Sequence, residues 1–167
     1  MIEMFGDEPV RRFALANNFY RSSPWHDDEQ HPAAFVGDVL VGFCVSSPPG
    51  RCHVCMDIDP ERPPDDQLQV LEWQFEVNVQ AAHADHDGHA WISRVVVDSA
   101  LHGAGIGRTL MVQAVAQLRV DGAKAVLLEC QDHRENFYVA CGFRRVRTFP
   151  DPAGPDAILM RADLGPR

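Results

Sequence analysis

The stretch LHGAGIGRTL, Leu101–Leu110, places three glycines within five residues and runs directly into a pattern that predicts a helix. A helix N-terminus carries four unpaired backbone N–H groups and about half a positive charge, so it attracts anions. Glycines at Gly103, Gly105 and Gly107 would let a phosphate approach the main chain and would tolerate positive φ angles. The stretch therefore predicts an anion-binding loop, and the glycines alone would also fit a tight turn between strand and helix.

Two common nucleotide-binding motifs do not fit this loop. A Walker A loop requires G-x-x-x-x-G-K-[ST], and no lysine follows these glycines. The dinucleotide-binding fingerprint requires G-x-G-x-x-G, whereas the spacing here is G-x-G-x-G. The loop thus belongs to neither of these two classes.

The segments around the loop alternate between strand and helix patterns. Apolar residues recur at helical spacing from Ile106 to Leu118, and Asp121-Gly122 follows as a helix end. AVLLEC, at 125–130, is a continuous apolar run typical of a strand that is covered on both faces. The remaining predicted elements are a strand at 90–97, a short helix at 134–142 closed by Gly142, and strands at 144–149 and 157–164.

The first half of the chain predicts further strands. Residues 33–47 resemble a hairpin that turns at Gly37-Asp38, and 53–59 form a short alternating pattern. Strict alternation of apolar and polar residues over 71–80 predicts a strand that pairs with 90–97 in a long antiparallel hairpin. Residues 9–20 favour a helix. The order of elements indicates a mixed α/β architecture.

Length and charge limit the possible functions. A chain of 167 residues predicts a single domain over 1–167, with its core at 69–164 and a poorly interpretable N-terminal segment at 1–33. A net charge of −9 argues against nucleic acid as a partner and mildly favours amines. No apolar run approaches the roughly 20 residues of a membrane span, and no signal pattern opens the chain. We therefore expect a cytoplasmic protein with no membrane partner.

Cysteine and histidine patterns give weak signals. The five cysteines are odd in number, which argues against a disulfide scaffold. CHVC at 52–55 has no second pair at zinc-ribbon spacing, and HADHDGH at 83–89 has no fixed ligand spacing. We therefore expect no metal site. The alternative, a zinc-binding interaction domain, would require these cysteines and histidines to converge in space.

Two stretches together carry a family resemblance. VVVDSALHGAGIGRTLM, at 95–111, resembles the acetyl-CoA-binding motif [QR]-x-x-G-x-[GA] of the GNAT superfamily of N-acyltransferases. FYVACGF, at 137–143, resembles the family's aromatic-Tyr helix that ends in Gly-Phe. The resemblance covers 91–164. It implies a mixed, mostly antiparallel sheet flanked by helices, with a strand–helix–strand core that binds acyl-CoA. It also implies an enzyme that transfers the acetyl group of acetyl-CoA, its co-substrate, to a primary amine of a small molecule or protein.

The resemblance also implies roles for individual residues. The strand residues that would pair with the pantetheine arm are Val95, Val96 and Val97. The residues that would hold the pyrophosphate through backbone N–H groups are Gly103, Ala104, Gly105, Ile106, Gly107 and Arg108. Tyr138 would protonate the departing CoA thiolate.

Two positions depart from the family pattern. His102 stands where the motif has Gln or Arg, and its imidazole could still contact a phosphate. Gln131, seven residues before Tyr138, would replace the asparagine found in many relatives. We assign both to the cofactor site.

The general base is less clearly marked. Glu129, at the end of a predicted central strand, is the carboxylate that we assign to catalysis beside Tyr138, with Glu76 and His133 as alternatives. Each could equally be a structural or solvated side chain. A non-catalytic acyl-CoA-binding module is the competing function, and the late strands could support a homodimer.

Overall fold

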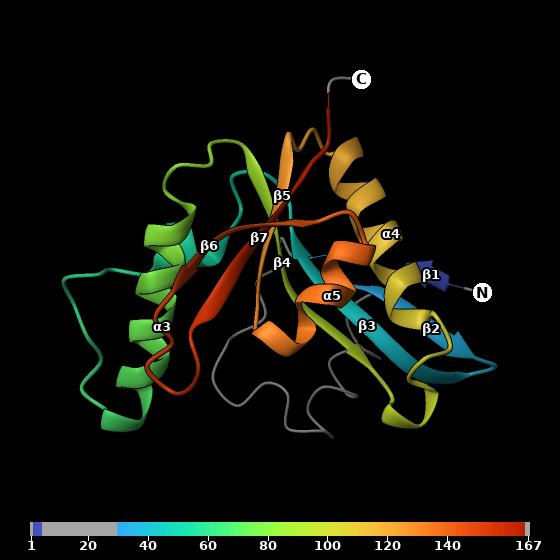
Figure 1. The fold of residues 1–167 in the computed structure, drawn as a ribbon, viewed down its shortest axis with the longest axis horizontal. Helices are drawn as coiled ribbons and strands as arrows, with labels where there is room; N and C mark the ends of the chain where they lie inside the picture. The colour runs from blue at the N-terminus through green and yellow to red at the C-terminus, as the bar shows by residue number, and fades with distance from the viewer. Residues whose placement is uncertain (1, 5–29, 166–167) are drawn as a thin grey trace.

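The computed structural model describes residues 2–4 and 30–165, and within them the strands form one seven-stranded sheet in the order β1-β2-β3-β4-β5-β7-β6. Figure 1 shows α3 on one side of this sheet and α4 on the other. The helix expected at 9–20 lies outside the described residues. The strands are β1 (Ile2–Met4), β2 (Pro32–Val36), β3 (Val39–Ser47), β4 (His89–Val97), β5 (Ala125–Cys130), β6 (Arg144–Phe149) and β7 (Ala157–Asp163). The helices are α2 (His53–Asp57), α3 (Gln67–His83), the short 3₁₀ helix η1 (Ser99–Leu101), α4 (Ile106–Val120) and α5 (Asp132–Ala140).

The sheet is mostly antiparallel, and β4 and β5 form its parallel pair. A parallel pair requires a crossover connection, which α4 provides. The strand–helix–strand unit predicted around the glycine loop is thus confirmed, as is the β2–β3 hairpin. Among the described helices, none is both long and apolar enough to cross a bilayer.

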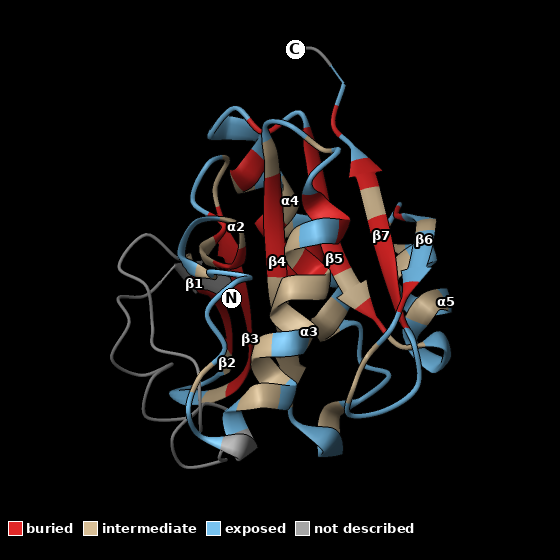
Figure 2. Ribbon diagram, turned by 90° about the vertical axis from the view of Figure 1, so that its left-hand side faces the viewer, coloured by how far each residue is buried: buried red, intermediate tan, exposed pale blue. Residues whose placement is uncertain are grey.

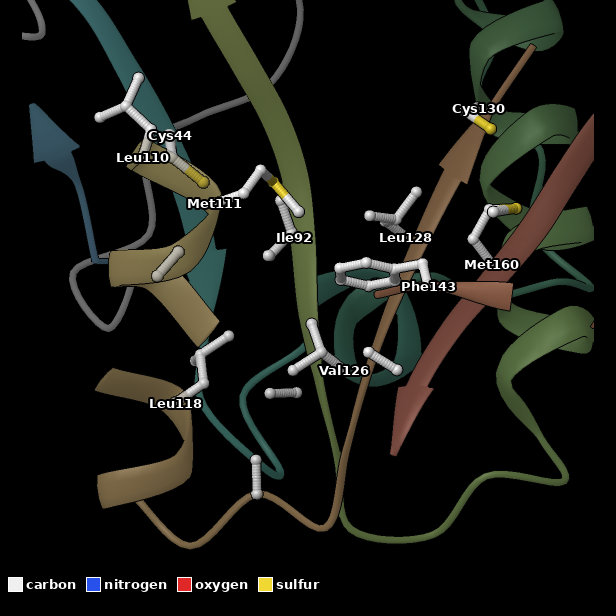
Figure 3. Close-up of a cluster of buried hydrophobic side chains, with 14 of the residues drawn as sticks. Cys44, Ile92, Leu110, Met111, Leu118, Val126, Leu128, Cys130, Phe143 and Met160 are labelled. Carbon is white, nitrogen blue, oxygen red and sulfur yellow. The ribbon is translucent and has the colours of Figure 1, made fainter. Parts of the chain in front are cut away.

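The main hydrophobic core lies between α4 and the sheet. Leu110, Met111 and Leu118 of α4 are at most 1% exposed. Figure 3 shows them beside the sheet residues Ile92, Val126 and Leu128. Figure 2 shows the buried residues concentrated along β4, β5 and β7. A second cluster covers the opposite face beneath α2 and α3 and includes Val79, Trp91, Leu127 and Leu159.

The strand expected at 71–80 is wrong, because these residues belong to α3. The alternating pattern contains a helical one as well: half-buried Phe75 and buried Val79 and Ala82 are spaced i, i+4, i+7. Leu71, which the alternation places on the buried face, is 47% exposed. Because β4 already has β3 and β5 as neighbours, the sheet has no position for the long hairpin expected here.

The short strand expected at 53–59 is also wrong, because the structure has the helix α2 at His53–Asp57. Val54 is 2% exposed and Met56 is 59% exposed. The two alternating side chains therefore do not share a buried face. Tertiary packing on β4 and β5, rather than the alternation, decides the conformation of this segment.

Candidate functional site

The sheet opens between β4 and β5. The two strands pair at His89–Ala125, Ala90–Val126 and Trp91–Leu127, and no pair follows among the described residues. On the other edge of β4, Ser46 of β3 pairs with Ile92 and Val45 with Arg94, so Ser93 is an extra residue in β4. Such a β-bulge bends its strand and is frequent next to active sites. From the bulge to Val97, β4 therefore leaves one backbone edge for an extended ligand.

The glycine loop follows this open edge. Asp98 caps the start of η1: its Oδ1 accepts a hydrogen bond from the Ala100 N–H at 2.9 Å. Gly103 and Gly105 have φ angles of 86° and 81°, a region that non-glycine residues rarely adopt. Gly105 is the N-cap of α4, and its carbonyl accepts the Thr109 N–H at 3.0 Å. The first N–H groups of α4 thus point toward the loop, as an anion site requires.

Gly107 allows α4 and α5 to approach each other. A Cβ at Gly107 would lie 3.3 Å from Cζ of Phe137 and 3.6 Å from a methyl carbon of Val97. The first distance is closer than ordinary contact. Gly107 thus has a packing role in addition to the phosphate role that the sequence predicts.

Tyr138 lies in the last turn of α5, half-buried against the α4 core. Burial, with smaller contributions from Cys130 and Cys44, raises the pKa of Tyr138 to about 12. The phenol is therefore protonated throughout the physiological range, as a proton donor must be. The helix end behind it is fixed by Gly142, with φ 92°, and by the Phe143 N–H, which donates to the Tyr138 carbonyl at 3.0 Å.

Arg145 of β6 binds the start of α5, a contact that the sequence pattern did not predict. Its guanidinium contacts Glu135 Oε2 at 2.6 Å and Asp132 Oδ1 at 2.9 Å. Both carboxylates lie in the first helical turn, where negative charge stabilises the helix. A run of basic residues in a predicted strand gave no signal for this role.

His102 folds back onto the end of β4. Its Nε2 lies 3.1 Å from the Val97 carbonyl oxygen, which can only accept, so Nε2 carries the proton. In the neutral imidazole the second nitrogen, Nδ1, then has no proton to donate to a phosphate. In this position the N–H of His102 binds the Val97 carbonyl and is not available to bind an anion.

Glu129 and Tyr138 lie on opposite faces of the sheet. Leu128 and Cys130 belong to the α4 core with Tyr138, whereas Leu127 belongs to the α3 cluster, and side chains alternate along a strand. Glu129, two residues after Leu127, therefore lies on the same face as Leu127. Its Oε1 lies 2.6 Å from His83 Nε2, and its Oε2 accepts a hydrogen bond from the Trp91 Nε1–H at 2.8 Å. Both carboxylate oxygens are thus engaged on the α3 face, which does not favour the predicted catalytic role.

The remaining predicted site residues, Glu76, His133 and Gln131, lie on three different parts of the fold. Glu76 is half-buried on α3. Burial, followed by the negative charge of Glu72, raises the pKa of Glu76, whereas the positive charge of Arg94 beside the bulge lowers it. His133 is exposed on α5 and accepts a hydrogen bond from Arg134 Nε at 3.1 Å. Gln131 is the N-cap of α5, at the open end of β5.

Comparison with known proteins agrees with this geometry. Residues 2–143 match the model of the acetyltransferase (GNAT) family, so the chain belongs to that family. No curated protein matches the chain in sequence.

Solved structures share the fold. An aminoglycoside 6′-N-acetyltransferase complexed with coenzyme A is 16% identical, with a TM-score of 0.64 and coverage of 100% of this chain and 98% of that one. The ribosomal-protein-S18-alanine N-acetyltransferase from Escherichia coli is 13% identical, with a TM-score of 0.62 and coverage of 100% and 95%. A Bacillus subtilis acetyltransferase in complex with CoA is 16% identical, with a TM-score of 0.57 and coverage of 98% and 97%. The predicted GNAT-like fold is confirmed.

Proposed function

We propose that this protein transfers the acetyl group of acetyl-CoA to a primary amine. The observation that carries the proposal is the continuity of two features: the open edge of β4 beyond the Ser93 bulge leads directly into the Gly103–Arg108 loop at the N-terminus of α4. An extended pantetheine arm would pair with Val95–Val97, and the pyrophosphate would lie on the loop. Similarly folded acetyltransferases that are complexed with CoA support CoA as the ligand.

The reaction would be a direct transfer. The neutral amine attacks the thioester carbonyl carbon, a C–N bond forms, and the C–S bond breaks. A backbone N–H of Val95–Val97 would stabilise the negative charge on the carbonyl oxygen. The amine loses a proton to a base, and the CoA thiolate takes a proton from the Tyr138 hydroxyl.

Glu76 is the carboxylate that we propose on the amine side. It lies half-buried on α3, and its interaction with Arg94 places it toward the bulge in β4. Its raised pKa brings it closer to the range useful for a general base. Glu129, with both oxygens hydrogen-bonded, instead has a structural role in this proposal.

Calorimetric titration with acetyl-CoA and a thiol-release assay on a panel of amines test the proposal. The panel contains polyamines, aminoglycosides and peptides with free N-termini. We expect saturable binding of acetyl-CoA and CoA release that depends on the amine. Glu76→Gln should remove the part of the rise of kcat/KM with pH that comes from a carboxylate. Glu72→Gln, four residues earlier on the same helix, should keep that rise but shift it to lower pH, because the charge of Glu72 raises the pKa of Glu76. Failure of the folded protein to bind acetyl-CoA would overturn the proposal.

A non-catalytic acyl-CoA-binding module is the second candidate. The position of His102, whose Nε2–H is used by the Val97 carbonyl, distinguishes this loop from one with a Gln or Arg donor. Binding of acetyl-CoA without CoA release on any amine would favour this candidate. The cytoplasmic location and the homodimer stay predictions. The five free cysteines are consistent with the first of these, because thiols stay reduced in the cytoplasm.

A further inference from the structure

Four potential metal ligands converge on the α3 face of the sheet, away from the proposed acyl-CoA site at the end of β4. Cys52 and Cys55 come from the start of α2, His83 from the end of α3, and His89 from the start of β4. One ligand atom of each lies within 4.8 Å of all the others. The two sequence tracts that looked weak separately, CHVC and HADHDGH, each supply two of the four residues.

The distances within the cluster match a tetrahedral zinc site. His83 Nδ1 lies 3.7 Å from Cys52 Sγ and 3.5 Å from Cys55 Sγ, and His89 Nε2 lies 3.9 Å from Cys55 Sγ. Zinc bonds of about 2.3 Å to sulfur and about 2.0–2.1 Å to nitrogen, at tetrahedral angles, separate sulfur from nitrogen by about 3.6 Å. These three pairs would need to change by only a few tenths of an ångström. The remaining pairs, all within 4.8 Å, would need to close by at most about 1.5 Å to reach tetrahedral zinc distances.

Both histidines are held in the tautomer that a metal needs. On His83, the ring nitrogen away from the sulfurs lies 2.6 Å from Glu129 Oε1. On His89, Nδ1 contacts the His86 carbonyl oxygen. Each of these oxygens accepts a hydrogen bond from the outer N–H, so in the neutral imidazole the inner nitrogen presents a lone pair to the centre of the cluster. Glu129 is itself fixed by Trp91, which completes a carboxylate–histidine arrangement typical of metal sites.

Burial and access are consistent with a structural site. His83 and Cys52 are 1% and 2% exposed, and Cys55 and His89 are half-buried. A hollow of about 600 Å³ that opens to solvent is lined by all four residues, so an ion can enter. Four protein ligands leave no open position for substrate, as in structural rather than catalytic zinc sites.

We propose that Cys52, Cys55, His83 and His89 bind one structural Zn²⁺ ion, with Glu129 as the residue that positions His83. Binding would release the two thiol protons to solvent and leave a neutral complex of two thiolates and Zn²⁺. The ion would join α2, α3 and β4, three elements that are distant in sequence. This replaces the expectation that the chain has no metal site, and it does not depend on the acyl-transfer proposal.

The first test uses the full-length protein, purified with reductant and without chelator. Mass spectrometry of the metal content should give one zinc per chain. After exchange with Co²⁺, we expect thiolate-to-cobalt charge-transfer absorption and the intense visible bands of a tetrahedral ion. Folded protein that binds neither Zn²⁺ nor Co²⁺, or binds Co²⁺ without thiolate absorption, would overturn the proposal and leave a hydrogen-bonded thiol–imidazole cluster.

Variants identify the ligands. Cys55→Ser should reduce the charge-transfer absorption by about half if the ion stays on the other three ligands, and should abolish it if the ion is lost. Cys141→Ser, which removes a half-buried cysteine outside the cluster, should keep it. Glu129→Gln should retain the ion but weaken its binding about 10–100-fold in competition with a chelator, as loss of an outer partner does elsewhere. An unchanged affinity would remove Glu129 from the proposal.

Alkylation of the cysteines in the wild-type protein tests the zinc site without relying on the folding of Cys55→Ser. In the wild-type protein, Cys52 and Cys55 should resist alkylation until a chelator is added, while Cys141 should react at the same rate before and after. Because Cys52 is only 2% exposed, the decisive residue is the half-buried Cys55: equal labelling of Cys55 in both conditions would contradict the zinc site.

Discussion

Replacing Gly105 with alanine tests whether the left-handed loop conformation is needed for CoA binding. The φ angle of Gly105 is 81°, and no described atom lies within 4 Å of the added Cβ. The substitution therefore introduces no clash. Its cost is the left-handed conformation itself, about 1–2 kcal/mol for a residue that has a Cβ.

The same cost should appear in ligand binding. If the free variant relaxes out of the left-handed region, CoA must restore that conformation when it binds. A cost of about 1–2 kcal/mol then raises the Kd for CoA about 5–30-fold. Calorimetric titration measures the Kd, and urea denaturation measures the free energy of unfolding.

Gly37→Ala is the matched control. Gly37 has φ 58° in the turn between β2 and β3, and no described atom lies within 4 Å of its added Cβ. We expect a comparable loss of unfolding free energy with no change in the Kd for CoA. A Gly105→Ala variant that loses little unfolding free energy, and has therefore relaxed, yet binds CoA as tightly as the wild type would refute the assignment of this loop to the pyrophosphate.

Three further predictions follow from buried or closely packed positions. Tyr138→Phe should lower kcat about 10²–10⁴-fold if the phenol is the acid. Because burial raises the pKa of Tyr138 to about 12, the kcat of the wild type should not fall through deprotonation of this residue until the pH nears that value. A fall of kcat near the ordinary pKa of tyrosine, about 10, would contradict this. Gly107→Leu should displace Phe137, whose Cζ would lie 3.3 Å from the new Cβ, and weaken CoA binding in the same titration. Leu118→Ala, at a fully buried position, should cost about 2–5 kcal/mol of unfolding free energy, whereas Val112→Ala on the same helix, at a side chain that is 59% exposed, should change it by less than about 0.5 kcal/mol.

The proposed zinc site and the proposed acyl-CoA site share β4. His89 and Trp91, at its start, face the α3 cluster and the Glu129 carboxylate. Val95–Val97, at its end, border the opening beyond the Ser93 bulge. An ion at the start of the strand would fix α2 and α3 on this face, and Glu76 of α3 is the carboxylate proposed near the amine.

The amino-acid sequence determined the second half of the fold directly. The local signals are Gly105 in front of a helical pattern, the unbroken apolar run AVLLEC, and Gly142 after a short helix. Each can be recognised from a few neighbouring residues, because positive φ favours glycine and an apolar run indicates a covered strand. The family resemblance drawn from these stretches is confirmed by the family model.

Only the tertiary structure decided the features that depend on distant neighbours. Residues 71–80 alternate as a strand would, yet they form a helix because the sheet positions beside β4 are occupied by β3 and β5. The sequence places Glu129 at the end of a central strand, but only the side-chain alternation of β5 shows that it contacts His83 and Trp91 on the face opposite Tyr138. The convergence of Cys52, Cys55, His83 and His89 has the same cause: their separations along the chain carry no information on distances that the packing of α2 and α3 on the sheet sets.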